Sequence, residues 1–398
     1  MKHFYIITLF IFSSFLGFSQ TYNADVEAFI NEVNLDSLIF QLRNLSGEDP
    51  VEIDGEITTI EHRVSNWGNN LAANYLTQEL EELGYEAQNH NYSLNGQNIY
   101  AIHEGSVYPD EYYMICTHYD AVDYYCADDN ASGCAAVLEA ARILKDTEFE
   151  YSIIFAFWDE EEIGLIGSGA YASEAASNGD IIHSVINMDM ISWDNDGDMV
   201  AELHSSYQAN SNLLADYIVE VNSIYGLQID THIELPGTSA SDHSRFWSNG
   251  FPAVLVIEEY YGGDFNPYYH TEQDRIAILN MPYFHEMAKL SIGSLVSLSL
   301  PLLNTSTEEL LSLEGINVNT YPNPFKHEAT ITYSLEEESF IQISLLNSFG
   351  KEISILENGI KPSGEHQLQL QAGNLSHGLY LLHTQTSKGT SIQKVMIN

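Results

Sequence analysis

Residues 116–133 read CTHYDAVDYYCADDNASG, which places one histidine and several carboxylates between two patterned segments. The run before it, at 112–116, is apolar and aromatic, as is typical of a buried strand. After it, apolar residues recur at helical spacing over 131–145. Ligands of open α/β sheets bind outside the carboxyl ends of the strands, so this strand-to-helix loop is a candidate metal or catalytic site.

The alternation of strands and helices continues on both sides of this loop. We expect short strands at 86–93 and 98–103 and buried strands at 151–158, 184–188 and 253–258. Helical patterns lie at 69–83, from about 162, at 210–225 and at 282–300. This order predicts an α/β fold of three layers, in which helices cover a mostly parallel mixed sheet. We place this domain at 51–303.

Both ends of the chain differ from this domain. Residues 1–20 combine Lys2 and His3 with an apolar stretch and predict a secretory signal peptide. The stretch is shorter than the roughly 20 residues that span a bilayer, and we expect no stable membrane insertion. Residues 21–50 predict either one or two helices that cap the domain or a removable propeptide.

The composition changes again after a predicted linker at 304–317. Short alternating segments separated by turn residues follow at 329–335, 340–346, 367–371, 379–386 and 391–397. They predict a small all-β sandwich at 318–398.

Charge and cysteine content exclude several classes of protein. The net charge of -44 makes attachment to nucleic acid or to an anionic membrane unfavourable. Three cysteines, Cys116, Cys126 and Cys134, exclude a disulfide-dense scaffold and leave at least one thiol unpaired within the chain. A Cys126–Cys134 disulfide is possible. We expect a monomer.

Residues that can bind metals follow four of the predicted strands. They are His118, Asp129, Glu161, Glu162, Asp189 and His270. Taken alone, two of these features have explanations that need no metal. The helix dipole favours acidic residues such as those at 159–162 near a helix start, and His270 could pack within an aromatic loop. Asp189 is harder to explain without a partner, because a buried carboxylate costs several kcal/mol. Two histidines and three carboxylates can hold two zinc ions if one carboxylate bridges them.

Six ordered motifs give residues 36–300 a resemblance to the zinc aminopeptidases of metallopeptidase family M28. They are HYD at 118–120, ADDNASG at 127–133, EEIGL at 161–165 with GS at 167–168, MDM at 188–190, SDH at 241–243 and NPYYHT at 266–271. The resemblance implies a zinc-peptidase fold and a secreted enzyme that hydrolyses peptide bonds, most simply by releasing N-terminal residues.

The resemblance also implies a role for each residue of the predicted site. Asp129 would bridge two zinc ions, His118 and Asp189 would complete one site, and Glu162 and His270 would complete the other. Glu161 falls on the general base, which takes the proton of the attacking water and passes it to the leaving amine. Asp120 falls on the carboxylate that orients the His118 imidazole.

Two other functions stay open. A glutaminyl cyclase-like zinc enzyme shares the fold, although retention of Asp129 favours two metal ions over one. A non-catalytic surface adhesin on a peptidase fold is the alternative outside enzymes, and the complete ligand set with Glu161 argues against it.

Two polar segments nearby have weaker interpretations. Ser241, Asp242 and His243 are consecutive and cannot by themselves present a serine-hydrolase triad, so we interpret them as pocket wall. The related aminopeptidases have a cysteine pair just before this segment, whereas this chain has Pro236 and Ala240. Residues 194–198 resemble a calcium loop, but their glycine comes too early for an EF-hand.

The C-terminal segment also resembles a known family. YPNPF at 321–325, GLY at 378–380 and a last strand with Lys394 are similar to the sorting domains of type IX secretion. A carbohydrate-binding or spacer sandwich is the alternative. The resemblance implies transit through the periplasm, contact with the type IX machinery, and release from or attachment to the cell surface.

Overall fold

The computed structural model describes residues 22–64, 66–300, 318–335, 337–347, 352–373, 375, 378–386 and 389–397. The predicted signal peptide (1–20) and linker (304–317) lie outside the described residues, so both stay predictions. The described chain divides into two compact units on either side of 301–317. Within the described residues, no helix combines the length and apolar character needed to cross a bilayer.

An eight-stranded mixed sheet forms the centre of the first unit, in the order β3-β4-β6-β5-β7-β10-β8-β9. Its strands are β3 (Gln88–Asn91), β4 (Gln97–His103), β5 (Tyr108–His118), β6 (Tyr151–Trp158), β7 (Ile181–Met188), β8 (Val200–His204), β9 (Asp230–Glu234) and β10 (Ala253–Ile257). The central strands β6, β5, β7 and β10 run parallel to one another. Every residue of β6 and β10 is buried, which explains their continuous apolar sequences.

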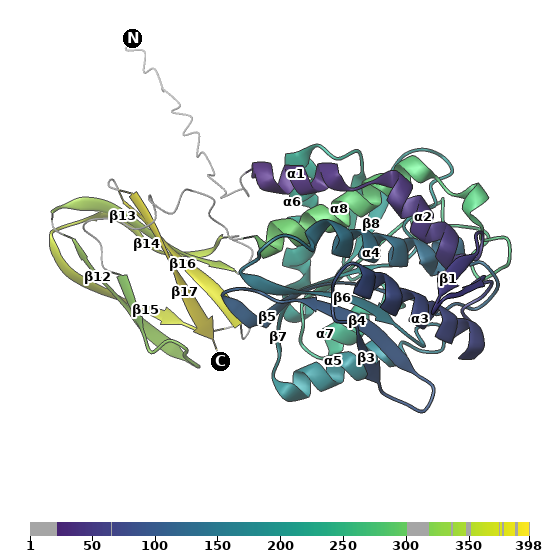
Figure 1. Cartoon of the computed structure of the whole chain (residues 1–398). Coiled ribbons are helices and arrows are strands. Elements are labelled where there is room, and N and C mark those ends of the chain that lie inside the picture. Colours follow the sequence, from purple (N-terminus) through teal and green to yellow (C-terminus); the bar gives the residue numbers. More distant parts are fainter. Residues whose placement is uncertain are drawn as a thin grey trace, which may run out of the picture. The chain divides into compact units, whose positions relative to one another are not determined.

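Helices cover both faces of this sheet (Figure 1). They are α1 (Ala24–Glu32), α2 (Leu35–Leu45), α3 (Asn66–Glu82), α4 (Gly133–Leu144), α5 (Ile166–Asn178), α6 (Ser211–Tyr225), α7 (His243–Ser248) and α8 (Met281–Ser299). Helices α4, α6 and α8 pack on one face, with α1 and α2 outside them, and α5 and α7 pack on the other. The predicted three-layer α/β fold is confirmed.

The prediction was wrong in a few elements. Helix α5 begins at Ile166 rather than near Glu162, because Glu160 and Leu165 have positive φ angles of 56° and 57° that interrupt a helix. The sequence did not predict β8, β9 or α7. These elements have only five or six residues. The polar residues within β8 and β9 also obscure the alternation of apolar and polar positions that marks a strand.

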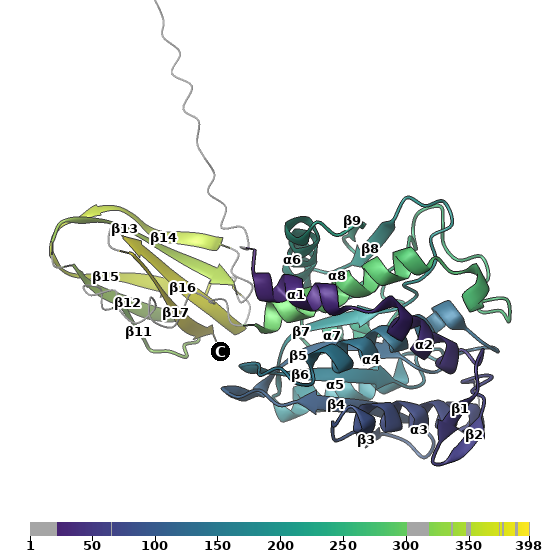
Figure 2. The ribbon, with the colours of Figure 1, turned by 45° about the horizontal axis from the view of Figure 1, so that its top comes forward.

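The N-terminal segment is part of the core of the first unit. Helix α1 lies along α8 in both views (Figures 1 and 2), and α2 contacts α4. The backbone N–H of Asn34 and the hydroxyl of Ser37 each donate to the buried Glu139 carboxylate at 2.7 Å. These contacts match the predicted capping helices, and removal of 21–50 as a propeptide stays a prediction.

A pair of substitutions in α2 tests this conclusion. Leu38→Ala should lower the free energy of unfolding by about 2–5 kcal/mol, because Leu38 is 0% exposed and its loss leaves a cavity. Phe40→Ala is the matched control, since Phe40 lies two positions away and is 57% exposed. Urea unfolding measures both. Equal, small effects would show that α2 is dispensable.

The second unit consists of two antiparallel sheets. One contains β11 (Val318–Tyr321), β12 (Glu328–Leu335) and β15 (Gly364–Gln371), and the other contains β14 (Glu352–Lys361), β13 (Ser339–Asn347), β16 (Gly378–Thr386) and β17 (Gly389–Ile397). Ile331 of the first sheet and Ile343 and Leu382 of the second belong to one buried cluster. The predicted small sandwich is confirmed, and β11 and β14 are strands that the sequence did not predict.

Candidate metal centre

The predicted ligands meet at one edge of the large sheet. His118 is the last residue of β5, and Asp189 directly follows β7. Glu161 and Glu162 lie in the turn after β6, and His270 lies between β10 and α8. Because β5, β6, β7 and β10 are parallel, their carboxyl ends share this edge.

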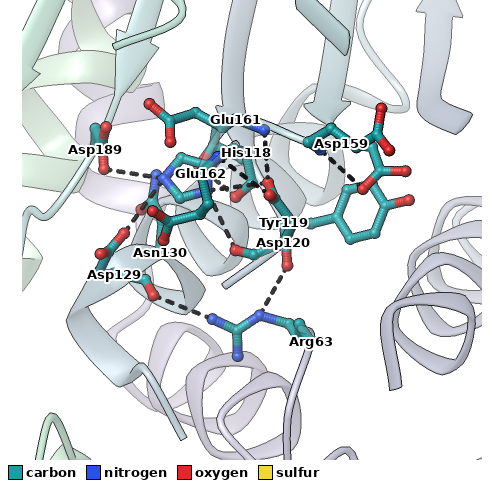
Figure 3. A network of polar contacts seen from close by, with 12 residues as sticks. Arg63, His118, Tyr119, Asp120, Asp129, Asn130, Asp159, Glu161, Glu162 and Asp189 are labelled. Atoms are coloured by element: carbon teal, nitrogen blue, oxygen red, sulfur yellow. Dashed lines mark hydrogen bonds and ion pairs between the residues drawn. The ribbon is translucent and has the colours of Figure 1, made fainter. Parts of the chain in front are cut away.

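The Asp129 carboxylate lies between two pairs of side chains. Its Oδ1 is 3.3 Å from His118 Nε2, and the same nitrogen is 3.2 Å from Asp189 Oδ1. Its Oδ2 is 3.3 Å from His270 Nε2, which is 3.0 Å from Glu162 Oε2. Figure 3 shows His118, Glu162 and Asp189 gathered around Asp129. One carboxylate thus faces two histidine–carboxylate pairs.

The donor set fits divalent cations such as zinc. Ligand atoms of His118, Asp129 and Glu162 lie within 4.8 Å of one another, and so do those of His118, Glu161 and Asp189. Asp129 Oδ2 and Glu162 Oε1 are buried and make no hydrogen bond within the described structure. Buried polar atoms are costly without partners, and carboxylates with imidazoles are common zinc ligands.

The pKa values of the site residues also favour a bound cation. Burial, and after it the Asp129 charge, raise the pKa of Glu162 to about 7. Burial also raises the pKa of Glu161 well above its ordinary value, although the charge of His118 opposes this. Burial lowers the pKa of His270, but the close contacts with the carboxylates of Asp129 and Glu162 outweigh it and raise the pKa to about 10. A bound cation would stabilise the ionised forms of these crowded carboxylates.

Asp120 connects the two glutamates to His118. Its carboxylate accepts hydrogen bonds from the backbone N–H groups of Glu161 at 3.1 Å and Glu162 at 3.2 Å. His118 Nδ1 lies 3.2 Å from the Asp120 carbonyl oxygen and 3.5 Å from Asp120 Oδ1. Donation from Nδ1 leaves Nε2 free to bind a metal.

Arg63 supports the loop below the site, and sequence reasoning missed it. Its guanidinium is 0% exposed and donates hydrogen bonds of 2.6–3.3 Å to the backbone carbonyls of Leu45, Tyr119, Tyr125, Cys126 and Asp129. Figure 3 shows it beneath Tyr119 and Asp129. No local pattern signals this role, because the carbonyls lie 18–66 positions away along the chain.

A cavity of about 260 Å³ opens onto the ligand residues. Its lining also includes Met190, Leu255, Ile257, Tyr260 and Phe265. Met190, Leu255 and Ile257 form one buried cluster, with Tyr260 and Phe265 packed against it. Tyr269 lines the cavity too and stacks on the His270 ring at a centroid distance of 3.5 Å. The cavity therefore combines acidic and apolar walls.

The SDH segment does not form a catalytic triad. The Ser241 hydroxyl donates to Asp189 Oδ2 at 2.7 Å, and His243 Nε2 donates to the carbonyl of Thr238 at 2.9 Å. Ser241 lines the cavity, while Asp242 and His243 are fully buried.

The remaining site predictions concern cysteines and calcium. All three cysteines are buried free thiols, so a Cys126–Cys134 disulfide does not form. In the 194–198 loop, acidic oxygens of Asp194 and Asp196 lie within 4.8 Å of each other and of Asp264. Exposed acidic groups gather in this way without a cation, and calcium stays a prediction.

Comparisons with known proteins agree with this architecture. Residues 98–294 match peptidase family M28, and residues 319–398 match a secretion system C-terminal sorting domain. A probable leucine aminopeptidase of Arthroderma otae is 30% identical over 187 residues, which are 44% of this chain and 48% of that protein. This chain spans about half the length of the curated relatives it matches.

Solved structures share the fold. The LapA aminopeptidase of Legionella pneumophila superposes with a TM-score of 0.62 at 21% identity, over 71% of this chain and 77% of that one. A glutaminyl cyclase of Bacteroides thetaiotaomicron superposes with a TM-score of 0.53 at 18% identity, over 66% and 97%. The α/β unit of this chain carries a domain of peptidase family M28, and a secretion-system C-terminal sorting domain follows it.

Proposed function

We propose that the protein is an exported di-zinc metallopeptidase that releases N-terminal residues from peptides. The observation that carries the proposal is the position of Asp129, whose two oxygens face separate histidine–carboxylate pairs beside Glu161. His118 and Asp189 would complete one zinc site, and Glu162 and His270 the other. The M28 domain and the leucine aminopeptidase relatives support this proposal.

Proton transfer is the task of Glu161. Zinc at such a site lowers the pKa of bound water toward 7 and polarises a carbonyl group. Glu161 lines the cavity and would accept the proton of the attacking water, then donate it to the leaving amine. Burial raises the pKa of Glu161, which makes this carboxylate a better proton acceptor than an exposed glutamate.

Asp120 would position these groups rather than touch the substrate. It holds the backbone of Glu161 and Glu162 and lies against the His118 ring. A ligating histidine is oriented by the acceptor of its second nitrogen, and loss of such an acceptor costs about 10- to 100-fold in metal affinity or activity.

The walls of the cavity suggest which peptides would bind. The apolar lining of Leu255, Ile257 and Phe265 suits an apolar N-terminal side chain. The carboxylates on the other walls suit a protonated α-amino group, because opposite charges attract across a partly buried site.

One experiment tests the proposal against its main alternatives. Purified protein is incubated with a library of peptides while zinc is quantified by mass spectrometry, and N-terminal glutamine peptides are assayed for ammonia release. We expect two zinc ions per chain and release of apolar N-terminal residues. Ammonia release without hydrolysis would favour a glutaminyl cyclase, and a metal-free, inactive protein would favour an adhesin.

The sorting domain supports export, and its removal makes a second test. Deletion of 320–398 should leave hydrolysis by the purified α/β unit nearly unchanged, because domains joined by linkers carry their own cores. In the native host the truncated protein should accumulate in the periplasm as active enzyme. Inactivity of the purified truncation would contradict domain independence, and normal secretion would contradict a sorting role through the type IX machinery.

A further inference from the structure

Strand β8 carries a buried acid–histidine pair that the mechanism does not use. Glu202 is 3% exposed and His204 is 0% exposed, and His204 Nε2 lies 2.8 Å from Glu202 Oε2. The two residues are two positions apart, so both side chains leave the same face of the strand. A buried carboxylate is costly without donors, and this pair therefore calls for a structural or functional explanation.

The pair lies directly beside the apolar lining of the cavity, on the neighbouring strand. In the antiparallel pairing of β8 with β10, His204 is opposite Leu255 and Glu202 is opposite Ile257. Opposed residues of an antiparallel pair place their side chains on the same face of the sheet. Leu255 and Ile257 line the cavity, whereas Glu202 and His204 do not. The pair can therefore act on a substrate only through its neighbours.

Glu202 holds the segment that follows β10. Both oxygens of its carboxylate accept a hydrogen bond from the backbone N–H of Tyr261, at 2.8 and 3.0 Å. The rings of Tyr260 and Tyr261 stand edge-on to the His204 ring at centroid distances of 5.6 and 4.9 Å. Tyr260 itself lines the cavity.

His204 holds a second segment of the cavity wall. Its Nδ1 accepts a hydrogen bond from the backbone N–H of Thr238 at 3.0 Å. Because that N–H can only donate, the ring proton is assigned to Nε2, which donates to Glu202. Gly237 packs so closely that a Cβ there would lie 2.6 Å from the backbone nitrogen of Ser205. Thr238 lines the cavity, and no disulfide holds its loop.

We propose that the Glu202–His204 pair sets the selectivity of the enzyme for the N-terminal side chain. It fixes Thr238 and Tyr260, two residues from separate segments of the cavity wall, relative to Leu255 and the rest of β10. The inference rests on the proposed peptidase function and adds the residues that control its substrate range. Both members of the pair are positioning residues, since neither reaches the cavity.

The test compares leucine and alanine 4-nitroanilides on zinc-loaded, full-length enzyme. His204→Phe keeps a flat ring but removes both the acceptor for Thr238 and the donor to Glu202. The ratio of kcat/KM for leucine over alanine should fall about tenfold, because pocket contacts discriminate side chains that differ by a few methylenes by about 10- to 200-fold. Metal content should stay as in the parent enzyme.

A matched control lies on the neighbouring strand. His232 and Asp230 of β9 form an acid–histidine pair at the same spacing, with Nε2 3.4 Å from Oδ2 and side chains 52% and 67% exposed. His232→Phe should leave the ratio unchanged. His204→Gln should restore part of it, because the amide can accept from Thr238 and donate to Glu202.

A second variant covers the possibility that His204→Phe does not fold. Gly237→Ala displaces the same loop through its contact with Ser205 while keeping the side chains of Glu202 and His204, and should lower the ratio in the same direction. Equal losses on both substrates in these variants would overturn the inference, since they would indicate a purely structural role. An inactive parent enzyme with full metal content would overturn the proposed function and the inference together.

Discussion

Glu161→Gln should lower kcat by about 10²- to 10⁴-fold while the protein keeps its full zinc content, because the amide cannot accept the proton of the attacking water. The backbone of residue 161 would still donate to Asp120, so the turn should keep its shape. Initial rates on leucine 4-nitroanilide and zinc analysis of the same dialysed sample measure the two effects.

The neighbouring glutamates provide the controls. Glu162→Gln should reduce zinc content, because Glu162 Oε2 lies 3.0 Å from His270 and faces the second proposed metal position. Glu160→Gln should change neither quantity, since the Glu160 carboxylate accepts from Tyr92 and does not line the cavity. If Glu161→Gln loses metal and Glu162→Gln keeps it, the two roles are exchanged.

Asp129→Ala should remove zinc from both positions and abolish hydrolysis. Burial raises the pKa of Asp129, but the close contacts with His118 and His270 outweigh it and hold the pKa below its usual range, which favours the ionised form that binds cations. Its loss takes one ligand from each position. Zinc content should fall from two ions per chain to less than one.

His270→Ala should have a smaller effect on metal content. His270 faces only the Glu162 side of the centre, and its side chain is 36% exposed. The variant should therefore keep the ion held by His118 and Asp189. Circular dichroism and thermal unfolding of both variants separate metal loss from misfolding. Equal zinc loss in the two variants would contradict a bridging role for Asp129.

The sequence alone determined the fold class and the six residues that the structure brings together. Strands such as β6 and β10 are buried on both faces and stay apolar throughout, so each is visible in a short window. Ligand-type residues follow these strands directly, and parallel pairing makes the ends meet. The local sequence pattern was therefore sufficient to predict which residues meet at this edge of the sheet.

Only the tertiary structure revealed what surrounds these residues. Arg63 binds carbonyls up to 66 positions away, and Glu202 and His204 hold segments that begin 34 or more positions further on. A hydrogen bond to a backbone carbonyl or N–H does not depend on the identity of the residue that supplies it, so it leaves no pattern in the sequence. Such contacts are decided by where the folded chain passes, and they become visible only when the sheet has brought the loops together.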